Sequence, residues 1–364
     1  MTDLLSPIRV GALELPNRVV MAPMGRARSG PDRVPGEIVQ RYYVQRATAG
    51  LIITEASSVS PMSVSRPGTS AIVGVEHVAG WRKVTERVHE AGGRIVQQLY
   101  HLGRKSDHTR MPGGAQILAP SAIACRGQIV GANGPVDFAV PRALETHEIP
   151  GIVGEFRDAI RNAKAAGMDG VEIHGANGYL IDEFLRDGTN RRTDRYGGSV
   201  ANRARFMLEI VEEAVAIFGA DRVGARISPH FGVDGIADSD PAGTFTHVAR
   251  ALAARKIAYL HVIEAVVPGT PHSPPDMKPL LPALREAFPG PLMANGSYTR
   301  ETAEAAIAGG HTDMVSFAVL FIGNPDLVER FRRRAGYNAA DPATFFNGGE
   351  TGYIDYPALD GVAA

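Results

Sequence analysis

The sequence predicts an α/β fold in which residues 1–364 form one domain, a single (β/α)8 TIM barrel. Two observations predict it: short runs rich in Val and Ile alternate with amphipathic helical patterns, and eight such runs occur. This alternation is typical of parallel sheets, and eight strands close a barrel. The alternative, a doubly wound open sheet, usually carries GxGxxG after its first strand. The corresponding stretch here, GRARSGPDRVPGE, lacks that spacing, so the barrel is favoured.

The repeat can be followed along the whole chain. The eight expected strands are 18–24, 50–56, 93–100, 170–176, 223–229, 258–264, 291–297 and 314–319. Between most of them, apolar residues recur at helical spacing. The clearest expected helices are 78–92, 150–167, 199–219 and 244–256. After the last strand, which we expect to end at Val319, a further helix should carry Asn324 and Pro325 in its cap region.

Two segments lie outside this repeat. Residues 4–18 predict a small hairpin that turns at Gly11 and plugs the bottom of the barrel. Residues 101–149, after the third strand, form a long loop rich in Gly and Pro. Loops of this length in a compact domain usually serve as lids or substrate walls, so we expect this one to border the site.

Composition excludes several classes of function. The 364 residues include 38 Lys and Arg against 39 Asp and Glu, a net charge of −1, so a basic footprint for nucleic acid is missing. No apolar run approaches the roughly 18 residues of a membrane span, and the first residues lack the pattern of a signal peptide. The single cysteine, Cys125, forms neither an internal disulfide nor a metal-binding cluster. We expect a cytoplasmic protein that binds no metal and acts on a small molecule, with its oligomeric state open.

The residues at the carboxyl ends of barrel strands build the active site in this fold. Reading only those positions gives a short set of candidates. They are Pro23, Met24 and Gly25, then Glu55 and Ala56, Gln98, Tyr100 and His101, His174, Asn177 and Tyr179, Arg226 and Ser228, Asn295 and Gly296, and lastly Ala318 and Val319.

The stretch VEIHGANGYL, residues 171–180, carries the candidate catalytic groups. If a helical turn follows His174, then His174 and Asn177 stand at positions i and i+3 and face the same way. Two neutral donors side by side suit a carbonyl or phenolate oxygen better than a metal ion. Tyr179 could then act as a proton donor, and such a weak acid serves only where the accepting carbon becomes strongly basic, as in an enolate. The alternative is a histidine that caps a strand end and a tyrosine in the wall.

Arg226 stands inside the apolar run VGARISP, and a guanidinium in a buried strand must be paired. Its partner could be the N1–C2=O2 edge of a flavin, or an internal carboxylate such as Glu55 or Glu172. Gln98 is similar, because its amide can bond the amide edge of a ring or a neighbouring backbone group. Three further histidines are interpreted as ordinary loop or surface residues: His101, His147 and His272.

The chain resembles the Old Yellow Enzyme family of FMN-dependent ene-reductases over nearly its whole length. The pattern HGANGYLIDEFL…N.RTD.YGGS..NRARF within residues 174–206 is highly specific for that family. Other stretches that carry the resemblance are LPNRVVMAPM (15–24), YYVQRATAGLIITEA (42–56), GWRKVTERVHEAGGRIVQQLYHLGR (80–104), FIGNPDLVERF (321–331) and GYIDYPAL (352–359).

The resemblance implies that FMN lies over the strand ends, is reduced by NAD(P)H and passes hydride from N5 to the β-carbon of an activated alkene. His174 and Asn177 would hold the oxygen of the electron-withdrawing group, and Tyr179 would protonate the α-carbon. The implied flavin and substrate contacts are Gln98 and Arg226 at the pyrimidine edge, Pro23, Met24 and Ala56 around the ring, and Tyr353 at the substrate pocket. Backbone N–H groups near Asn295 and Gly296 could receive the phosphate.

Three departures from the family pattern stand out, and they cluster on the flavin. Gly25 replaces the Thr or Cys that bonds flavin O4, and Tyr100 replaces a Trp. Ala318 and Val319 replace the Gly-Arg pair that contacts the FMN phosphate. Loss of one charged hydrogen bond costs about 1.5–3 kcal/mol, or roughly 10- to 150-fold in affinity.

Two hypotheses of function follow. In the first, the protein is a working flavin ene-reductase with a weakened grip on the phosphate. In the second, the barrel uses His174, Asn177 and Tyr179 without flavin for redox-neutral work on a carbonyl compound, such as isomerisation, cyclisation or a pericyclic step. A barrel that only binds a ligand is a third class, in which the three polar residues have no evident purpose.

Overall fold

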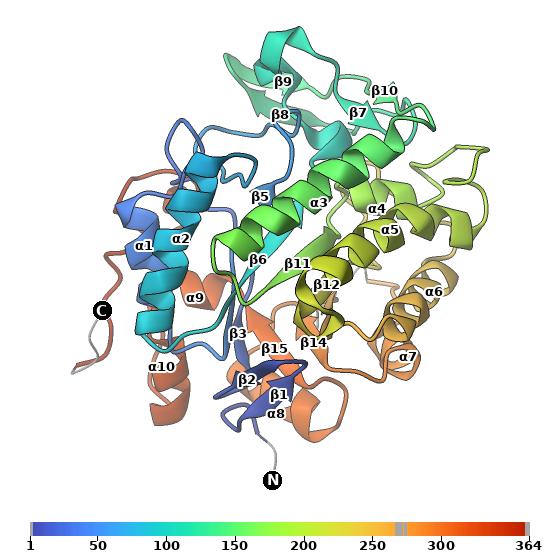
Figure 1. Ribbon diagram of the computed structural model, residues 1–364. Coiled ribbons are helices and arrows are strands. Elements are labelled where there is room, and N and C mark those ends of the chain that lie inside the picture. Colours follow the sequence, from blue (N-terminus) through green and yellow to red (C-terminus); the bar gives the residue numbers. More distant parts are fainter. Residues whose placement is uncertain (1–2, 266–271, 273–274, 361–364) are drawn as a thin grey trace.

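The strands close into a ring. The computed structural model describes residues 3–265, 272 and 275–360 (Figure 1). Parallel strands follow one another in the order β11, β12, β13, β14, β15, β3, β4 and β6, and pairing of β6 with β11 completes the barrel. Their bounds are β3 Val19–Met21, β4 Leu51–Ile53, β6 Ile95–Tyr100, β11 Gly170–Gly175, β12 Val223–Ile227, β13 Tyr259–Ile263, β14 Leu292–Asn295 and β15 Met314–Phe317. The predicted TIM barrel is confirmed.

Helices surround the ring on its outside (Figure 1). They are α1 Glu37–Val44, α2 Val75–Glu90, α3 Ile149–Ala165, α4 Leu180–Leu185, α5 Val200–Phe218, α6 Pro241–Ala254, α7 Leu281–Ala287, α8 Arg300–Ala308, α9 Val319–Gly323 and α10 Leu327–Arg333. The four predicted helices correspond to α2, α3, α5 and α6, with ends that differ by a few residues. Each of these four buries an apolar face against the barrel, which is why helical periodicity found them.

The long loop after β6 folds into small strands above the barrel (Figure 1). It contains the antiparallel pair β8 Gln128–Gly131 and β9 Gly134–Asp137, and the parallel pair β7 Leu118–Ala119 and β10 Arg142–Ala143. One further short strand, β5 Ser57–Ser58, adds to the edge of β6 beyond the end of β4. Among the described residues, no helix has the length and apolar character needed to cross a bilayer.

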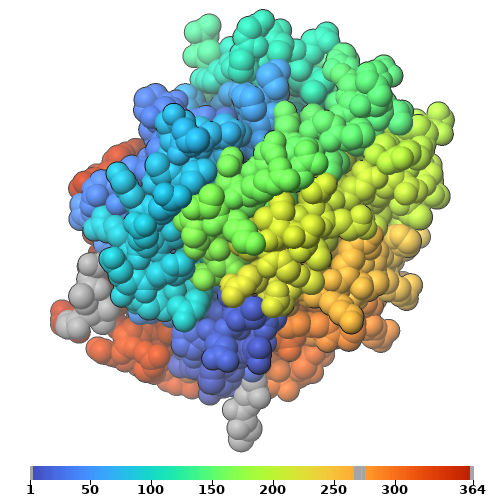
Figure 2. Space-filling view, in the orientation of Figure 1, coloured from blue at the N-terminus to red at the C-terminus, as the bar shows by residue number. Residues whose placement is uncertain are grey.

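A hairpin closes the lower end of the barrel, as the sequence predicted. Strands β1 Ile8–Val10 and β2 Leu13–Leu15 turn at Gly11, whose φ is +57°. A Cβ at Gly11 would lie 2.1 Å from the carbonyl oxygen of Asp221, so only glycine fits. The hairpin side chains join one apolar cluster with the inward-facing residues of the barrel, which leaves the opposite end for polar groups. In the space-filling view the hairpin, in dark blue, lies at the surface at the lower centre, between orange and red elements (Figure 2).

The end of the last strand differs from the prediction. Strand β15 stops at Phe317, Ala318 precedes a helix, and Val319 is already the first residue of α9. Asn324 lies in the cap region as expected, because it is the C-cap of α9, and its Nδ2 donates to the carbonyl oxygen of Leu320 at 2.8 Å. The expected strand over 314–319 was too long because an unbroken apolar run does not distinguish a buried strand from a buried helix.

Candidate active site

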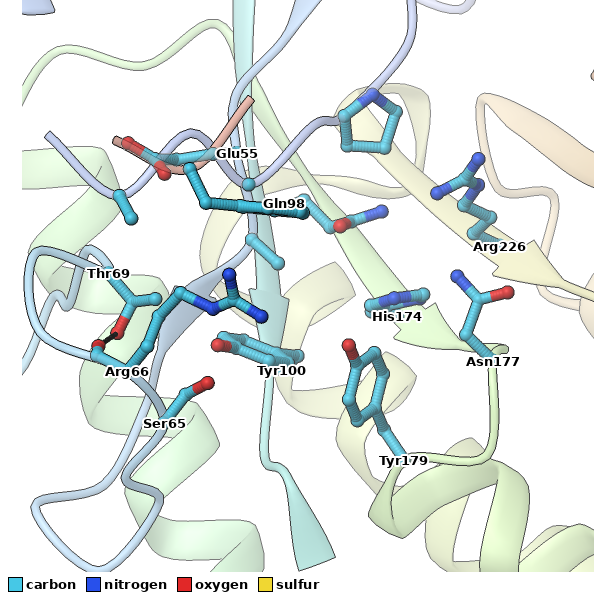
Figure 3. A pocket seen from close by; sticks show the side chains of 15 residues that line it. Glu55, Ser65, Arg66, Thr69, Gln98, Tyr100, His174, Asn177, Tyr179 and Arg226 are labelled. Atoms are coloured by element: carbon cyan, nitrogen blue, oxygen red, sulfur yellow. Dashed lines mark hydrogen bonds between the residues drawn. The ribbon is translucent and has the colours of Figure 1, made fainter. Parts of the chain in front are cut away.

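Two adjoining cavities open at the carboxyl ends of the strands. The first has a volume of about 290 Å³ and is lined from β6, β11, β12 and the segments after β3 and β4. The second has a volume of about 500 Å³ and lies over the ends of β13, β14 and β15. Pro23, Asn177 and Arg226 line both cavities, so the two form one continuous site. Figure 3 shows the first cavity.

The barrel brings together most of the predicted site residues. Those that line the first cavity are Pro23, Gly25, Ala56, Gln98, Tyr100, His174, Asn177, Tyr179 and Arg226. Those that line the second cavity are Asn295, Gly296, Ala318 and Val319, together with Pro23, Asn177 and Arg226 again. Met24 is not among the lining residues, and it packs against the apolar core instead. Neighbouring residues of an extended segment point to opposite sides, so Met24 turns away where Pro23 and Gly25 face the cavity.

A left-handed turn positions the candidate catalytic groups. His174 belongs to β11, and the chain then reverses through Asn177 and Gly178, whose φ angles are +60° and +72°. The helical turn expected after His174 is therefore wrong, because α4 begins only after Tyr179. The backbone N–H of Asn177 donates to Ser228 Oγ at 2.8 Å, which ties the turn to the end of β12.

A buried ion pair holds this turn in place. The backbone N–H of Gly178 donates to Asp182 Oδ2 at 2.9 Å, and Asp182 Oδ1 accepts from Arg186 Nε at 2.7 Å. The other guanidinium nitrogens of Arg186 donate to the carbonyl oxygens of Ser228 and Pro229 at 2.5 and 3.2 Å. The turn that carries Asn177 and the loop after β12 are therefore fixed by one fully bonded pair.

Aromatic contacts hold Tyr179 beside His174. The ring centroids of Tyr179 and His174 lie 5.2 Å apart, and those of Tyr179 and Tyr100 also lie 5.2 Å apart, both in edge-to-face arrangements. Burial, with a smaller effect from Tyr179, raises the pKa of Tyr100, so its phenol stays protonated. The hydroxyl of Tyr179 and the imidazole of His174 thus face the same cavity (Figure 3).

Three buried polar atoms of the first cavity lack a hydrogen-bond partner within the described part of the chain. They are His174 Nδ1, Asn177 Oδ1 and Arg226 Nε. Burial, followed by the charge of Arg226, lowers the pKa of His174 well below its ordinary value, so the imidazole is neutral. Unpaired buried polar groups are costly, and their grouping around one cavity indicates a polar ligand there.

Arg226 makes no ion pair with either proposed carboxylate among the described residues. Its Nη2 donates to Asn295 Oδ1 at 3.0 Å, and burial lowers its pKa to about 10. Because Nε stays unpaired, the guanidinium keeps a donor for a ligand at the junction of the two cavities.

A buried polar chain orients Gln98 beneath the first cavity. Gln98 Nε2 donates to Glu172 Oε1 at 2.7 Å, and Glu172 Oε2 lies 2.9 Å from His261 Nδ1. His261 Nε2 lies 2.8 Å from Ser316 Oγ. Each of these side chains is bonded at both ends or faces the cavity, so the amide of Gln98 is held in one orientation.

Tyr353 lies behind the site and not in it, which corrects the sequence expectation. It is fully buried and stacks on Tyr42 with ring centroids 4.1 Å apart. The guanidinium groups of Arg26 and Arg28 lie 5.1 and 4.8 Å from its ring. Phe346, from the same C-terminal segment, lines the first cavity instead.

Several lining residues were missed by reading strand ends. In the first cavity they are Ala27, Ser65, Arg66, Thr69 and Phe346, whereas Glu55, a strand-end candidate, lines it as well. In the second cavity His272, interpreted as an ordinary loop histidine, belongs to the lining. These residues come from loops and the C-terminal segment, whose positions depend on long-range packing. The only sequence signal was the isolated charge of Arg66 in the otherwise uncharged stretch PMSVSRPGTS.

The two cavities fit a flavin mononucleotide unequally. In the first, the unpaired Nε of Arg226 and the fixed amide of Gln98 suit the polar edge of a flavin ring. In the second, Arg226 is the sole Lys or Arg among the described lining residues, and half-exposed Val319 forms part of the wall. Gly296 has a φ of +142°, and a Cβ there would lie 2.4 Å from Ala265 Cα. The backbone at Gly296 therefore packs directly against the backbone at Ala265, which only glycine allows.

Comparisons with known proteins agree with this geometry. A sequence model of the NADH:flavin oxidoreductase / NADH oxidase family matches residues 3–337. The chain is 40% identical over 361 residues to the "Probable flavin mononucleotide-dependent alkene reductase" of Leishmania infantum, a match that covers 98% of this chain and 97% of that protein.

Two solved structures share the fold closely. Morphinone reductase in complex with tetrahydroNAD superposes with a TM-score of 0.93 and 45% identity, over 99% of this chain and 98% of that one. The Old Yellow Enzyme homologue from Zymomonas mobilis gives a TM-score of 0.95 and 42% identity, over 98% of this chain and 100% of that one.

Fold, site and relatives together define the class of protein, an FMN-dependent NAD(P)H oxidoreductase of the ene-reductase type. The chain belongs to the NADH:flavin oxidoreductase / NADH oxidase family, whose members include the Old Yellow Enzyme homologues. The resemblance found in the sequence is thus confirmed.

Glu55 introduces a titrating group into the wall of the first cavity. Its carboxylate accepts from the backbone N–H of Arg26 at 3.1 Å and from Ser29 Oγ at 3.4 Å. Burial raises its pKa to about 7 in spite of these bonds. A folded-state pKa above the unfolded value means that the stability contribution is complete below pH 4.5 and is lost as the pH rises through 7.

We therefore predict that the melting temperature falls between pH 5 and pH 8, and that Glu55→Gln makes this fall smaller. The contribution of Glu55 amounts to at most about 3 kcal/mol across the window. Thermal unfolding of both proteins at several pH values measures it, with Glu90→Gln, at an exposed position on α2, as the control. Parallel curves for Glu55→Gln and the parent would contradict the prediction.

Proposed function

We propose that this protein reduces the activated C=C bond of α,β-unsaturated carbonyl compounds with FMN and NAD(P)H, and that His174, Asn177 and Tyr179 act on the substrate. The observation that carries the proposal is the placement of His174, Asn177 and Tyr179 around one cavity, where His174 Nδ1 and Arg226 Nε have no hydrogen-bond partner within the described residues. A neutral imidazole beside an amide provides hydrogen bonds to an oxygen without first transferring a proton to it. The named relatives are reductases or Old Yellow Enzyme homologues, which favours this function over the redox-neutral alternative.

The substrate oxygen would lie between His174 and Asn177. Donors aimed at an oxygen that gains negative charge stabilise the transition state, and loss of one typically costs about 100- to 1000-fold in turnover. Tyr179 would deliver the proton to the α-carbon, since its ring is held edge-on by both His174 and Tyr100. The left-handed turn at Asn177 fixes these groups before substrate arrives.

FMN, when bound, supplies the hydride. We assign its ring to the first cavity, where Gln98 and Arg226 would bond the pyrimidine edge and Pro23 and Ala56 would line the ring. Gly25 offers no side-chain donor, and an added Cβ there would meet no atom within 4 Å, so space remains at this position.

We assign the FMN phosphate to the second cavity. There the backbone at Asn295 and Gly296 and the start of α9 at Ala318 and Val319 surround it. Backbone N–H groups can receive a phosphate, but without a guanidinium at position 319 the grip is weaker.

The proposed reductant is a nicotinamide dinucleotide, NADH or NADPH, since the solved relative named above holds tetrahydroNAD. The proposed location is the cytoplasm, because the single cysteine, Cys125, is buried and unpaired and its pKa is raised by burial to about 12. A chain whose fold needs no disulfide is suited to a reducing compartment.

The function is tested by anaerobic turnover. The protein loaded with FMN and supplied with NADPH or NADH should convert 2-cyclohexenone and N-methylmaleimide to their saturated products, because both carry the carbonyl that His174 and Asn177 are placed to hold. Product formation, followed by chromatography, should match reductant consumed one to one. Failure to reduce any enone or maleimide with bound flavin would refute the proposed function.

The phosphate assignment predicts that Val319→Arg tightens FMN binding by about 10-fold, the effect of one charged hydrogen bond. Riboflavin, which lacks the phosphate, should bind parent and variant equally. Val319→Met adds length without charge and serves as the matched control, with all dissociation constants measured by flavin fluorescence quenching. An unchanged affinity for FMN, or an equal gain for riboflavin, would show that the phosphate lies elsewhere.

A further inference from the structure

Arg66 is a cation at the rim of the first cavity that the chemistry described so far does not use. It lies in the segment between β5 and α2 and lines the same cavity as His174, Asn177 and Tyr179. Figure 3 shows its guanidinium reaching into the cavity toward Tyr100, on the side opposite His174 and Asn177. A substrate held at its oxygen by that pair would therefore extend toward Arg66.

Hydrogen bonds from Arg33 fix the backbone segment that carries Arg66. Arg33 donates to the carbonyl oxygens of Ser63, Thr69 and Ser70 at 3.2–3.3 Å, which joins the two ends of the segment. The hydroxyl of Thr69 donates to the carbonyl oxygen of Arg66 itself at 3.0 Å. A group held on a fixed backbone loses less entropy when it binds a ligand, so this anchoring favours a binding role.

The guanidinium of Arg66 is oriented by an aromatic ring and not by a carboxylate. Its Cζ lies 4.0 Å from the ring centroid of Phe346. Within the described part of the chain, the guanidinium makes no ion pair or hydrogen bond. Glu55, the sole carboxylate among the described lining residues, is bonded to Arg26 and Ser29 instead. The stack leaves the edge of the guanidinium, where its N–H groups lie, available for an anion.

We propose that Arg66, with the hydroxyl of Ser65 beside it, forms a subsite for a carboxylate on the substrate, so that the preferred substrate is an unsaturated carbonyl compound that also bears a carboxylate. This inference rests on the proposed function, because it assumes that the other end of the substrate is held by His174 and Asn177. A guanidinium fork matches a carboxylate with two parallel hydrogen bonds. The second cation of the cavity, Arg226, adds to the attraction for an anionic substrate.

The first test compares two substrates that differ only in charge, 4-oxocyclohex-2-ene-1-carboxylate and its methyl ester, on the FMN-loaded enzyme. The quantity measured is the ratio of kcat/KM for the acid to kcat/KM for the ester. Because Arg66 is exposed at the rim, solvent weakens its pull, and we expect Arg66→Met to lower the ratio by about 10-fold. Arg66→Lys should retain part of the preference for the acid over the ester. Because salt screens the attraction between charges, the ratio of the parent should fall as salt is added.

The matched control is Arg161→Met, which removes an exposed guanidinium from the outer helix α3 and should leave the ratio at the parental value. An unchanged ratio in Arg66→Met would overturn the subsite while the proposed function stands. If the ratio is unchanged and the KM for NADPH rises instead, Arg66 holds a phosphate of the reductant, and the proposal is wrong in that case also.

A binding measurement separates this inference from the proposed function. Calorimetric titration of the FMN-loaded protein with 4-hydroxybenzoate and with methyl 4-hydroxybenzoate needs no turnover. We expect the acid to bind the parent more tightly than the ester, and Arg66→Met to remove most of that preference. Equal affinity of acid and ester for the parent, or no binding of the acid, would contradict the subsite even if the enzyme reduces enones.

Discussion

The closure of the barrel between β6 and β11 is the constraint on which the site depends. The register of that pairing sets Gln98 beside Glu172, and the register of β11 with β12 sets His174 beside Arg226. Neighbouring residues in parallel register point to the same side of a sheet, so these side chains converge inside the ring. The lower interior is filled by the apolar side chains of the hairpin, which confines the polar groups to the opposite end. A polar site over an apolar plug thus follows from one ring of hydrogen-bonded strands.

Around the two cavities, one set of polar side chains is bonded within the protein and another is left for a ligand. The chain from Gln98 through Glu172 to His261 and Ser316 is bonded at each step, as is the Asp182–Arg186 pair behind the turn that carries Asn177. Unpaired atoms of His174, Asn177 and Arg226 lie at the cavity instead. Burying such atoms costs stability, and a bound ligand that supplies matching donors and acceptors offsets that cost. The rigid groups support the unpaired ones, so the site is preorganised for charge that arrives during reaction.

The sequence predicted the features that local periodicity determines. The eight strands and the hairpin turn at Gly11 were predicted from local patterns. The site residues at the strand ends were predicted because parallel strands place their carboxyl ends together. The end of β15 was misplaced because its apolar run continues into α9 without a change of character. The sequence did not show that Phe346, and not Tyr353, lines the cavity. The C-terminal segment is positioned by hydrogen bonds from Arg26 and Arg28, more than 300 residues away. Arg66 escaped notice for a similar reason, since its loop is shaped by Arg33.

The central claim is that two neutral donors at the mouth of the barrel stabilise an oxygen while it gains electron density. Its most direct measurement is the turnover of 2-cyclohexenone by the double variant His174→Leu/Asn177→Leu, with circular dichroism and bound FMN to show that the barrel is intact. The account predicts that kcat/KM falls by at least about 100-fold while fold and flavin content are retained. A folded, flavin-loaded double variant that turns over the enone as fast as the parent would contradict it.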